Sequence, residues 1–530
     1  MATRDLQPDE ASICASRRQS FTYDPDYLQA CMRAVDESWL DSPSVLSLSW
    51  SDWEADELAG FLDGLRQRGI QAYEARGRSF PPEAMMHDRA AVIPTIIVSP
   101  RSEWGVVETL KLLSSLRLYE RQSVSVRSGG HGYFNGASCS GIMINLGLMD
   151  RRRIVDDTLL LEPGCFLEQL IGTLADDGKA VPHGDCFGVG AGGHFLTAGW
   201  DIALARRYGL GCQSVIGGRV VLWDGSVVDV DEKSHPALLY AMRGGAAAGV
   251  GVVTEIRLRV IDQPPLVSWC FKSLYRAQLE TCVAQTAFAS AAGLPRDISV
   301  SFRFHFEPDQ LDPVCSFNIA SLLPMDKTNE YLRKHLGGDV ASLVDAPSEW
   351  NEKSLVDLRM LPASDALAAD PKMLAELSAV ALHESPLTYW KPTTSSREMA
   401  RSYFTSISHW VTLDSDAMFL KLYEAFRSVR DDPARERMYA LVIQGGGRMT
   451  ELQDQCSMPL GQALARFEIH WDDRHDERWC RRFTDSIDEI IKSKADHGPS
   501  RPYRGDIWLE EQGKDTVLEN ILKDYDRRHG

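Results

Sequence analysis

Apolar positions along the chain change their spacing near residue 91. Between Glu54 and Gly69 they recur every three or four residues, which predicts an amphipathic helix. The residues on its apolar face are Leu58, Phe61, Leu62 and Leu65. We therefore expect residues 1–90 to form a mostly helical N-terminal segment.

From residue 91 onward, short β-rich apolar runs alternate with glycine turns. The predicted strands lie at 96–98, 124–126, 142–144, 159–161, 220–222 and 252–254. Amphipathic helices are predicted between some of them, at 102–118 and 166–177. This mixture of strands and helices indicates an α+β architecture.

The segment Gln263-Pro264-Pro265 is the clearest domain boundary. It divides a glycine-rich domain, 91–262, from a second domain, 263–480, with fewer glycines and longer helices. Residues 481–530 form a C-terminal segment. We expect a helix over Lys514–Arg528 to pack back on the 91–262 domain.

Composition restricts the possible partners. The chain of 530 residues has 57 basic and 75 acidic side chains, a net charge of 57 − 75 = −18. This charge repels polyphosphates, and the one strong basic run is Arg151–Arg153, so we expect no nucleic-acid partner. No apolar stretch approaches the roughly 18 residues that a membrane span needs. The start, MATRDLQPDEASIC, lacks the apolar core of a secretory signal. We therefore expect a cytoplasmic protein with no membrane partner.

Glycine is concentrated in four clusters, at 128–132, 184–193, 208–211 and 243–245. Glycine lets a backbone approach a ligand closely, and consecutive backbone N–H groups form anion-binding concavities. The clusters therefore predict a large phosphate-bearing cofactor along the backbone. A glycine-rich structural core is the alternative.

Two other cofactors are weaker alternatives. Residues 188–193 contain G-x-G-x-x-G, but the flanking sequence lacks the preceding strand that a nicotinamide dinucleotide site requires. His183, Cys186 and His194 are metal-ligand types, yet their spacing matches no common zinc signature, so we expect no metal. The eleven cysteines are odd in number and irregularly spaced. That pattern argues against a disulfide framework and leaves room for one chemically used thiol.

Four ordered segments resemble one known family. Residues 126–132 resemble an R-S-G-G-H motif, and residues 186–194 resemble C-x-x-V-G-x-G-G-H. The segment 207–216 follows at the expected interval, and 239–254 matches the end of the domain. These are motifs of berberine-bridge-enzyme-like flavoproteins with the vanillyl-alcohol-oxidase fold. The resemblance is strong over 91–262 and weak over 397–530.

The resemblance implies a PCMH-type, two-subdomain FAD-binding domain and an antiparallel-sheet-and-helix substrate domain. It also implies that FAD is attached twice, with His131 bonded to the flavin 8α-methyl and Cys186 to flavin C6. Imidazole and thiolate are nucleophiles suited to these bonds. The cofactor-binding residues that it implies are Arg127, Ser128, Gly129, Gly130, His131, Gly132, Cys186, Gly190, Gly192, Gly193, His194, Gly251, Val252 and Val253. Val189 would lie where oxygen approaches.

The resemblance also implies a catalytic base. Residues 502–508 match the family's N-Y-x-D-x-D-L, with Tyr503 at the position of the tyrosine base, although Pro502 and Trp508 replace an asparagine and an aspartate. A phenol needs a shifted pKa for this role. Glu468 and His470 are competing candidates. They lie in 465–471, which resembles the strand over the flavin.

Strand alternation places Arg466, Glu468 and His470 on one face of 465–471, and Phe467, Ile469 and Trp471 on the other. The polar face would then reach a substrate, or be a solvated sheet face. Thr197-Ala198-Gly199-Trp200-Asp201 replaces the family's glycine-rich G-G-G-Y-G, which implies a changed pocket wall.

The function implied is that of an FAD-dependent oxidase. An alcohol or amine of a small natural product of secondary metabolism, or of a sugar, would lose a proton to the base and a hydride to flavin N5. Molecular oxygen would then accept the electrons and yield H2O2. The alternative is a flavin-binding fold without redox turnover that acts as a cyclase or a binding pocket. The sequence predicts no oligomeric state.

Overall fold

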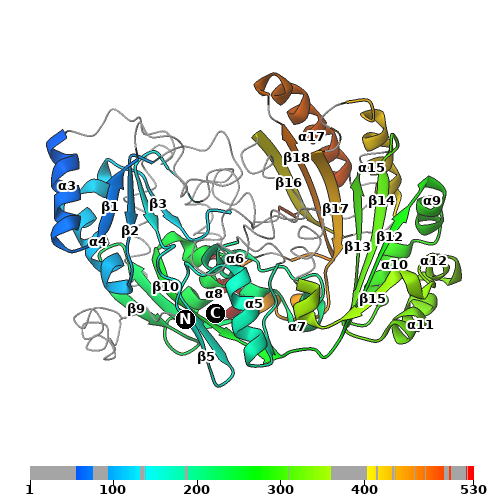
Figure 1. Ribbon diagram of the computed structural model, residues 1–530, viewed down its shortest axis with the longest axis horizontal. Helices are drawn as coiled ribbons and strands as arrows, with labels where there is room; N and C mark the ends of the chain where they lie inside the picture. Colours follow the sequence, from blue (N-terminus) through cyan, green and yellow to red (C-terminus); the bar gives the residue numbers. More distant parts are fainter. Residues whose placement is uncertain are drawn as a thin grey trace, which may run out of the picture.

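The computed structural model describes most of the chain between residues 55 and 529. The described residues are 55–75, 94–131, 137, 139–184, 189–307, 310–359, 403–412, 416–432, 435, 437–458, 460–471, 473–493, 501–502, 521, 523 and 525–529. They form three large β-sheets with helices between and around them (Figure 1). The α+β fold class predicted from the sequence is confirmed.

The first sheet has the strand order β1-β2-β4-β3. Its strands are β1 (Gln71–Glu74), β2 (Ile96–Ser99), β3 (Val124–Arg127) and β4 (Ile142–Asn145). The helices α3 (Ala55–Gln67) and α4 (Glu103–Ser115) share an apolar core with it. The predicted helices at 54–69 and 102–118 and the strands at 96–98, 124–126 and 142–144 are therefore confirmed.

The N-terminal division differs from the predicted one. Residues 1–90 were expected to be mostly helical, with no strand predicted among them, but residues 71–74 form strand β1, which pairs antiparallel with β2. Phe61 and Leu65 of α3 lie in the same core as Val106 and Leu110 of α4. The first sheet therefore begins before residue 91, because its edge strand comes from the N-terminal segment.

The second sheet is antiparallel, in the order β5-β6-β10-β8-β9. Its strands are β5 (Arg152–Val155), β6 (Thr158–Leu161), β8 (Val215–Leu222), β9 (Val227–Val230) and β10 (Gly251–Arg259). One face packs against α4 and the first sheet, and the other against α5 (Leu167–Asp176), α6 (Ala191–Thr197) and α8 (Pro236–Met242). The predicted helix at 166–177 and the strands at 159–161, 220–222 and 252–254 are confirmed.

A partly buried polar contact joins the first two sheets. The Arg219 guanidinium on β8 donates two hydrogen bonds of 2.7 Å to the Glu103 carboxylate at the start of α4. The Thr254 hydroxyl on β10 donates a third, at 2.9 Å. A bidentate pair fixes orientation as well as distance, so α4 is held in one register on the second sheet.

The chain enters the third sheet at the predicted proline boundary. The short strand β11 (Ile261–Asp262) pairs with β7 (Lys179–Ala180), and β12 (Val267–Leu274) begins the new sheet. Eight antiparallel strands follow in the order β15-β12-β14-β13-β17-β18-β16-β19. The others are β13 (Ile298–His305), β14 (Val314–Ser321), β15 (Trp350–Lys353), β16 (Tyr403–Val411), β17 (Met438–Gln444), β18 (Ala463–Trp471) and β19 (Arg501–Pro502).

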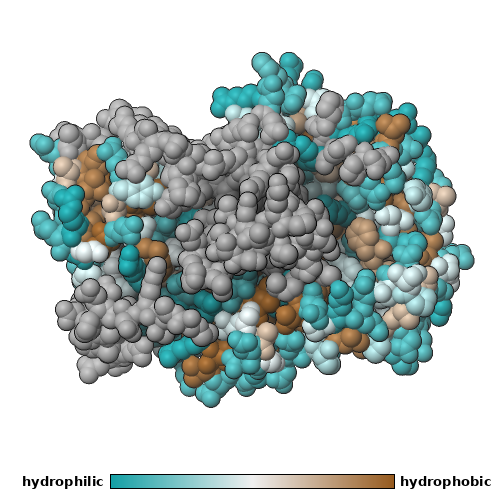
Figure 2. Space-filling view, in the orientation of Figure 1, coloured by the Kyte–Doolittle hydropathy of each residue, from teal (hydrophilic) through white to brown (hydrophobic). Residues whose placement is uncertain are grey.

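Helices cover one face of this third sheet, on the side away from the first two sheets (Figure 1). They are α9 (Arg276–Ala284), α10 (Ala287–Ser290), α11 (Met325–Leu336), α12 (Gly338–Ser342), α15 (Ala417–Ser428) and α17 (Glu477–Lys492). Their outer surface is mostly hydrophilic in Figure 2. The predicted boundary at 480 falls inside α17, whose Phe483 and Ile487 pack in the core of this sheet.

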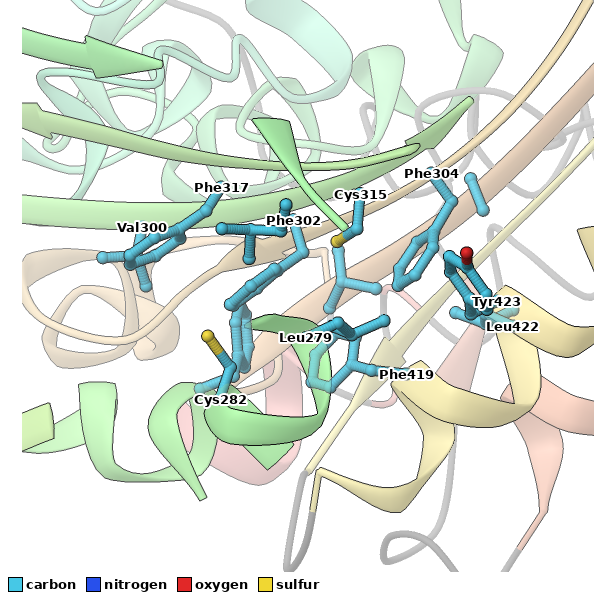
Figure 3. Packing of buried hydrophobic residues seen from close by; sticks show 14 of the residues in the cluster. Leu279, Cys282, Val300, Phe302, Phe304, Cys315, Phe317, Phe419, Leu422 and Tyr423 are labelled. Carbon is cyan, nitrogen blue, oxygen red and sulfur yellow. The ribbon is translucent and has the colours of Figure 1, made fainter. Parts of the chain in front are cut away.

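Aromatic rings dominate that core (Figure 3). Phe302 of β13 stacks on Phe317 of β14, with ring centroids 4.9 Å apart, and lies 5.1 Å from Phe419 of α15. Cys315 and Cys282 lie in the same core. The eight cysteines that the structure describes are all buried and free.

The second and third sheets meet at a small apolar junction. Trp200, which follows α6, packs on Trp410 of β16 with ring centroids 5.5 Å apart. Cys212 and Cys456 come together there, with their sulfur atoms 3.8 Å apart. The helices α7 (Ala205–Tyr208) and α16 (Arg448–Glu451) flank this junction. The Trp200 segment, expected to differ from the family, thus serves as an interdomain contact.

The C-terminal residues return to the second sheet. Ile521 is buried in the core formed by α5, α8 and that sheet. The Tyr525 ring lies 5.5 Å from Tyr240 of α8, and the Arg528 guanidinium pairs with Asp454 at 2.7 Å. Much of the predicted helix at 514–528 lies outside the described residues. Across the part of the chain that is described, no helix is sufficiently long and apolar to cross a bilayer.

Replacing Phe302 with alanine should destabilise the protein strongly. The side chain is 1% exposed and contacts the rings of Phe317 on a neighbouring strand and Phe419 on a helix, so its loss should cost about 3–5 kcal/mol. Leu311→Ala is the control, because Leu311 is 62% exposed and should change stability by no more than about 0.5 kcal/mol. Thermal melting measures both. Equal melting temperatures for the two variants would contradict this description of the core.

Candidate functional site

The first predicted motif forms a tight turn at the end of β3. The buried Arg127 side chain folds back, donating hydrogen bonds to Asn145 Oδ1 at 2.9 Å and to the Gly129 carbonyl at 3.1 Å. Gly130 has φ of +69°, and a Cβ there would lie 2.6 Å from Arg127 Nε. Only glycine meets both conditions without strain. The Arg127 side chain therefore stabilises the turn through its hydrogen bond to the Gly129 carbonyl.

The second predicted motif runs beside the loop before α5. The Leu167 N–H donates to the Val189 carbonyl at 3.0 Å, and the Ala191 N–H donates to the Cys165 carbonyl at 2.7 Å. Val189 is partly buried against the core of the second sheet. These bonds fix the backbone of 189–191 just before α6 begins.

The two motifs lock together, and we call the segments 127–131 and 189–194 the paired glycine loops. The Ser128 hydroxyl donates to the Pro163 carbonyl and accepts the Gly192 N–H at 3.2 Å. A Cβ on Gly190 would lie 2.1 Å from the Gly129 nitrogen, a distance that no pair of unbonded atoms tolerates. Glycine at position 190 is thus required by contact between the loops. Such glycines were expected to let a cofactor approach the backbone, with a glycine-rich structural core as the alternative.

Polar backbone groups of the paired glycine loops remain available to a ligand. Within the described part of the chain, the N–H groups of Gly129 and Gly130 donate no hydrogen bond. A Cβ on Gly193 would meet nothing within 4 Å. Adjacent unused N–H donors suit an anionic group such as a pyrophosphate. The half-buried His131 follows them directly.

Several of the predicted cofactor-binding residues lie in the second sheet, away from the paired glycine loops, or outside the described residues. Gly132 and Cys186 lie outside the described residues. Gly251 starts β10, where a Cβ would lie 2.2 Å from the Val221 carbonyl oxygen of β8. The side chains of Val252 and Val253 fill the cores on opposite faces of the second sheet. Their side chains therefore pack within the protein, and only the backbone of this segment is left for a cofactor.

His183 and His194 both bind the backbone of Gly184. His194 Nε2 accepts the Gly184 N–H at 3.1 Å, and His183 Nδ1 donates to the Gly184 carbonyl at 2.8 Å. Burial, and to a lesser degree the charge of Arg359, lowers the pKa of His194 to about 4. The same causes lower the pKa of His183 well below its usual value. Both rings are therefore neutral near neutral pH.

A buried ion pair lies beside these histidines. The Asp201 carboxylate accepts from the Arg359 guanidinium at 2.8 Å, and each side chain is 4% exposed. It also accepts the N–H groups of Ala203 and Leu204, at 2.9 and 2.8 Å. Arg359 in turn donates to the Val181 carbonyl at 2.9 Å. The pair thus anchors the loop before Cys186, and sequence reasoning missed it because its members are 158 residues apart.

The residues suggested as metal ligands are only partly described. Among the described residues, no group of three or more His, Cys, Asp or Glu side chains is arranged to hold an ion. His183 and His194 direct ring nitrogens to Gly184. The third suggested ligand, Cys186, lies outside the described residues.

A polar face of the third sheet carries the next group of predicted residues. On β18, Phe467, Ile469 and Trp471 enter the helix-covered core, so Arg466, Glu468 and His470 share the opposite face. Glu468 and His470 are each 1% exposed. A solvated sheet face, the alternative interpretation, is therefore excluded for these two side chains.

Glu468 stands at the centre of a hydrogen-bonded group. Its carboxylate accepts from the Tyr439 hydroxyl of β17 and from the Arg466 guanidinium. His470 Nε2 lies 3.9 Å from the same carboxylate. Burial, and then the charge of Glu468, raises the pKa of Tyr439 well above its usual value. Tyr439 therefore stays protonated and acts as a donor.

Sequence reasoning missed Tyr439 and its neighbour Arg303. The Arg303 guanidinium of β13 lies over the Tyr439 ring, 4.7 Å from the centroid. The alternation of side chains along the strand 438–444 was the signal that could have identified Tyr439. It places Tyr439 on the same face as Glu468 once β17 is paired with β18. Tyr503 lies outside the described residues, so its role stays a prediction. The preceding strand, β19, pairs with β16 at the sheet edge.

Comparisons with known proteins agree with this arrangement. Residues 94–231 match the family model described as FAD binding domain. The chain is 30% identical over 209 residues to a chitooligosaccharide oxidase of Gibberella zeae, an alignment that covers 38% of this chain and 40% of that relative. The chain thus matches less than half the length of this curated relative.

Solved structures extend the likeness to most of the chain. The berberine-bridge-enzyme-like protein 1 of Physcomitrella patens superposes with a TM-score of 0.67 at 16% identity, covering 88% of this chain and 96% of that one. A glucooligosaccharide oxidase from Acremonium strictum, described as carrying 6-S-cysteinyl, 8α-N1-histidyl FAD, has a TM-score of 0.67 at 18% identity, covering 88% and 95%. The chain therefore has an FAD-binding domain and the fold of these flavoproteins, and the predicted resemblance is confirmed.

Gly190→Ala should separate the paired glycine loops. The added methyl group would meet the Gly129 nitrogen and the Ser128 hydroxyl oxygen at 2.1 and 2.3 Å, and forced contacts of this kind typically cost about 1–3 kcal/mol. We expect a lower melting temperature and less bound flavin. Gly193→Ala, three residues away, has open space and should melt like the wild type. If Gly190→Ala also melts like the wild type, the loops do not depend on this contact.

Proposed function

We propose that this protein is an FAD-dependent oxidase whose flavin is attached covalently to both His131 and Cys186. The observation that carries the proposal is the contact between the paired glycine loops. It joins the turn that ends at His131 to the segment that follows Cys186. Support also comes from the FAD-binding match over 94–231 and from the neighbour that carries the same two linkages.

The residues present suit the cofactor. The N–H groups of Gly129 and Gly130 would bind the pyrophosphate, with Arg127 fixing the turn that presents them. His131 and Cys186 would provide the two attachment points. When bound, FAD supplies a two-electron acceptor that passes the electrons to O2 and forms H2O2. The loop around His183 and His194, anchored by Asp201, would keep the Cys186 segment in place.

The polar face of the third sheet would bind the substrate. Glu468, Tyr439 and Arg466 form a fixed group there, and His470 lies beside it. Tyr503 would take the proton from a substrate hydroxyl or amine, since Glu468 is already engaged by two donors. Relatives are named as oxidases of chitooligosaccharides, glucooligosaccharides and tetrahydroberberine. We infer a small alcohol or amine, from a sugar or a natural product.

A flavin-binding protein without redox turnover is the second candidate. It is favoured by Pro502 and Trp508, which replace an asparagine and an aspartate beside Tyr503. Anaerobic mixing with a panel of sugars and alkaloid alcohols distinguishes the two. For an oxidase, at least one compound should bleach the flavin absorbance, and air should restore it with release of peroxide. Product formation with an unchanged flavin spectrum would instead support the second candidate.

The double attachment predicts a graded response to mutation. His131→Ala and Cys186→Ala should each leave one covalent bond, so flavin should stay with the precipitated protein in acid. The double variant should release it. Cys139→Ala is a matched control, because Cys139 is a buried free thiol and its loss should change neither linkage. Yellow colour in the supernatant of acid-treated wild type would contradict the proposal.

Tyr503→Phe should slow reduction of the flavin by substrate about 10²–10⁴-fold, the usual contribution of a positioned general base. It removes one oxygen, so the covalent flavin should remain. Tyr403→Phe is the control, since Tyr403 packs beside Trp471 on the helix-covered face of the same sheet. Stopped-flow absorbance measures the rate. If Tyr503→Phe is as fast as wild type while Glu468→Gln or His470→Ala is slow, the base lies on β18.

A further inference from the structure

Arg303 is an unusual cation on the polar face of the third sheet. Arg303 pairs in register with Ser316 of β14 and Leu441 of β17, near the middle of the sheet. On the same face, the Arg466 guanidinium is bonded to the Glu468 carboxylate. Among the described residues, no carboxylate oxygen lies within 4.0 Å of the Arg303 guanidinium.

Among the described residues, other buried polar atoms on the same face of the third sheet lack partners as well, two of them on the neighbouring strand β14 and one on β16, three strands away from β13. The Nε atom of Arg303 itself is buried and makes no hydrogen bond. The same is true of Ser316 Oγ and Asn318 Oδ1 on β14, and of Ser406 Oγ on β16. Because buried polar groups are nearly always paired, four such atoms on one face indicate a site that is completed by a polar ligand.

The charge of this face selects the kind of ligand. The Arg466–Glu468 pair is neutral in sum, which leaves the positive charge of Arg303. The acid that follows β13 in the chain, Glu307, is engaged by Gln310 at 2.7 Å and by Ser273 at 3.3 Å. Burial, and then the charge of Arg303, lowers the pKa of His305, so that ring adds no second charge at neutral pH.

The guanidinium is also held in one orientation. It stacks on the Tyr439 ring at 4.7 Å, and Tyr439 is fixed by its hydrogen bond to Glu468. A stacked guanidinium keeps its in-plane N–H groups for a planar acceptor, and the carboxylate is the acceptor that matches this fork with two bonds.

We propose that Arg303 binds a carboxylate of the substrate, so that the protein prefers acidic compounds over their neutral analogues. The proposal rests on the proposed function for the identity of this face as the substrate site. It adds a specificity that none of the relatives' names contains. The alternative is that Arg303 only supports the Tyr439 ring and is otherwise solvated.

Isothermal titration calorimetry on the purified full-length protein tests this proposal without turnover. The probes are two pairs of similar shape, glucuronate with glucuronamide and benzoate with benzamide. For at least one pair, the wild type should bind the carboxylate at least about tenfold more tightly than the amide, as expected for hydrogen bonds to a charged group. Arg303→Gln should remove this difference, and Arg303→Lys should keep part of it.

Arg333→Gln is the matched control, because Arg333 is an exposed arginine on α11 that pairs with Asp345. It should keep the full preference for the carboxylate. Equal affinity of wild type for acid and amide in both pairs, or a preference that survives in Arg303→Gln, would overturn the proposal. So would the absence of binding by both carboxylates. Flavin content is measured on the same samples, so a protein without FAD refutes the proposed function separately from this result.

Discussion

The hydroxyl of Ser128 is the contact on which the candidate site depends. It bridges the Pro163 carbonyl and the Gly192 N–H, and so ties the turn after β3 to the start of α6. The contact is possible because position 190 has no side chain and lets two backbones approach within van der Waals distance. The first and second sheets each contribute one loop, and their relative position is set by the Glu103–Arg219 pair. The contact between the paired glycine loops and the packing of the first two sheets therefore both fix the relative position of the two loops.

The third sheet is constrained by the need to pair the polar and charged side chains that it buries. Its eight strands put aromatic side chains under the outer helices and polar side chains on the side that faces the first two sheets. Removing charges from water is costly unless each is paired. Glu468 meets this requirement through Tyr439 and Arg466, whereas the guanidinium of Arg303 lies over the Tyr439 ring and has no carboxylate within 4.0 Å among the described residues. Arg466 is therefore a member of a buried ion pair, whereas Arg303 carries a charge to which we assign a ligand of opposite sign.

Local pattern predicted much of the fold. Short apolar runs bounded by turn residues predicted strands at 96–98, 124–126, 142–144 and 220–222. Each of these runs lies within a strand of the structure. The strand at residues 71–74 was not predicted, because Gln71 and Glu74 are polar and the strand forms by pairing with β2. The boundary at 480 failed because α17 is continuous across it, its amphipathic face buried against β16 and β18.

A short motif suggested the candidate site around His131, whose role stays a prediction. The site was not predictable where partners come from distant strands. Arg359 meets Asp201 across 158 residues, and Tyr439 meets Glu468 only through strand pairing. The contact of Gly190 with Gly129 was not predictable either, because a sequence does not show whether a glycine makes room for a cofactor or for another loop.

The central claim is that the paired glycine loops bring His131 and Cys186 to one flavin. Mass spectrometry of a tryptic digest tests it most directly, since cleavage should place His131 in the peptide 128–151 and Cys186 in the peptide 180–206. The account predicts a single cross-linked species whose mass is the sum of both peptides and FAD, allowing for the hydrogens lost in forming the two bonds. Recovery of both peptides at their unmodified masses would contradict it.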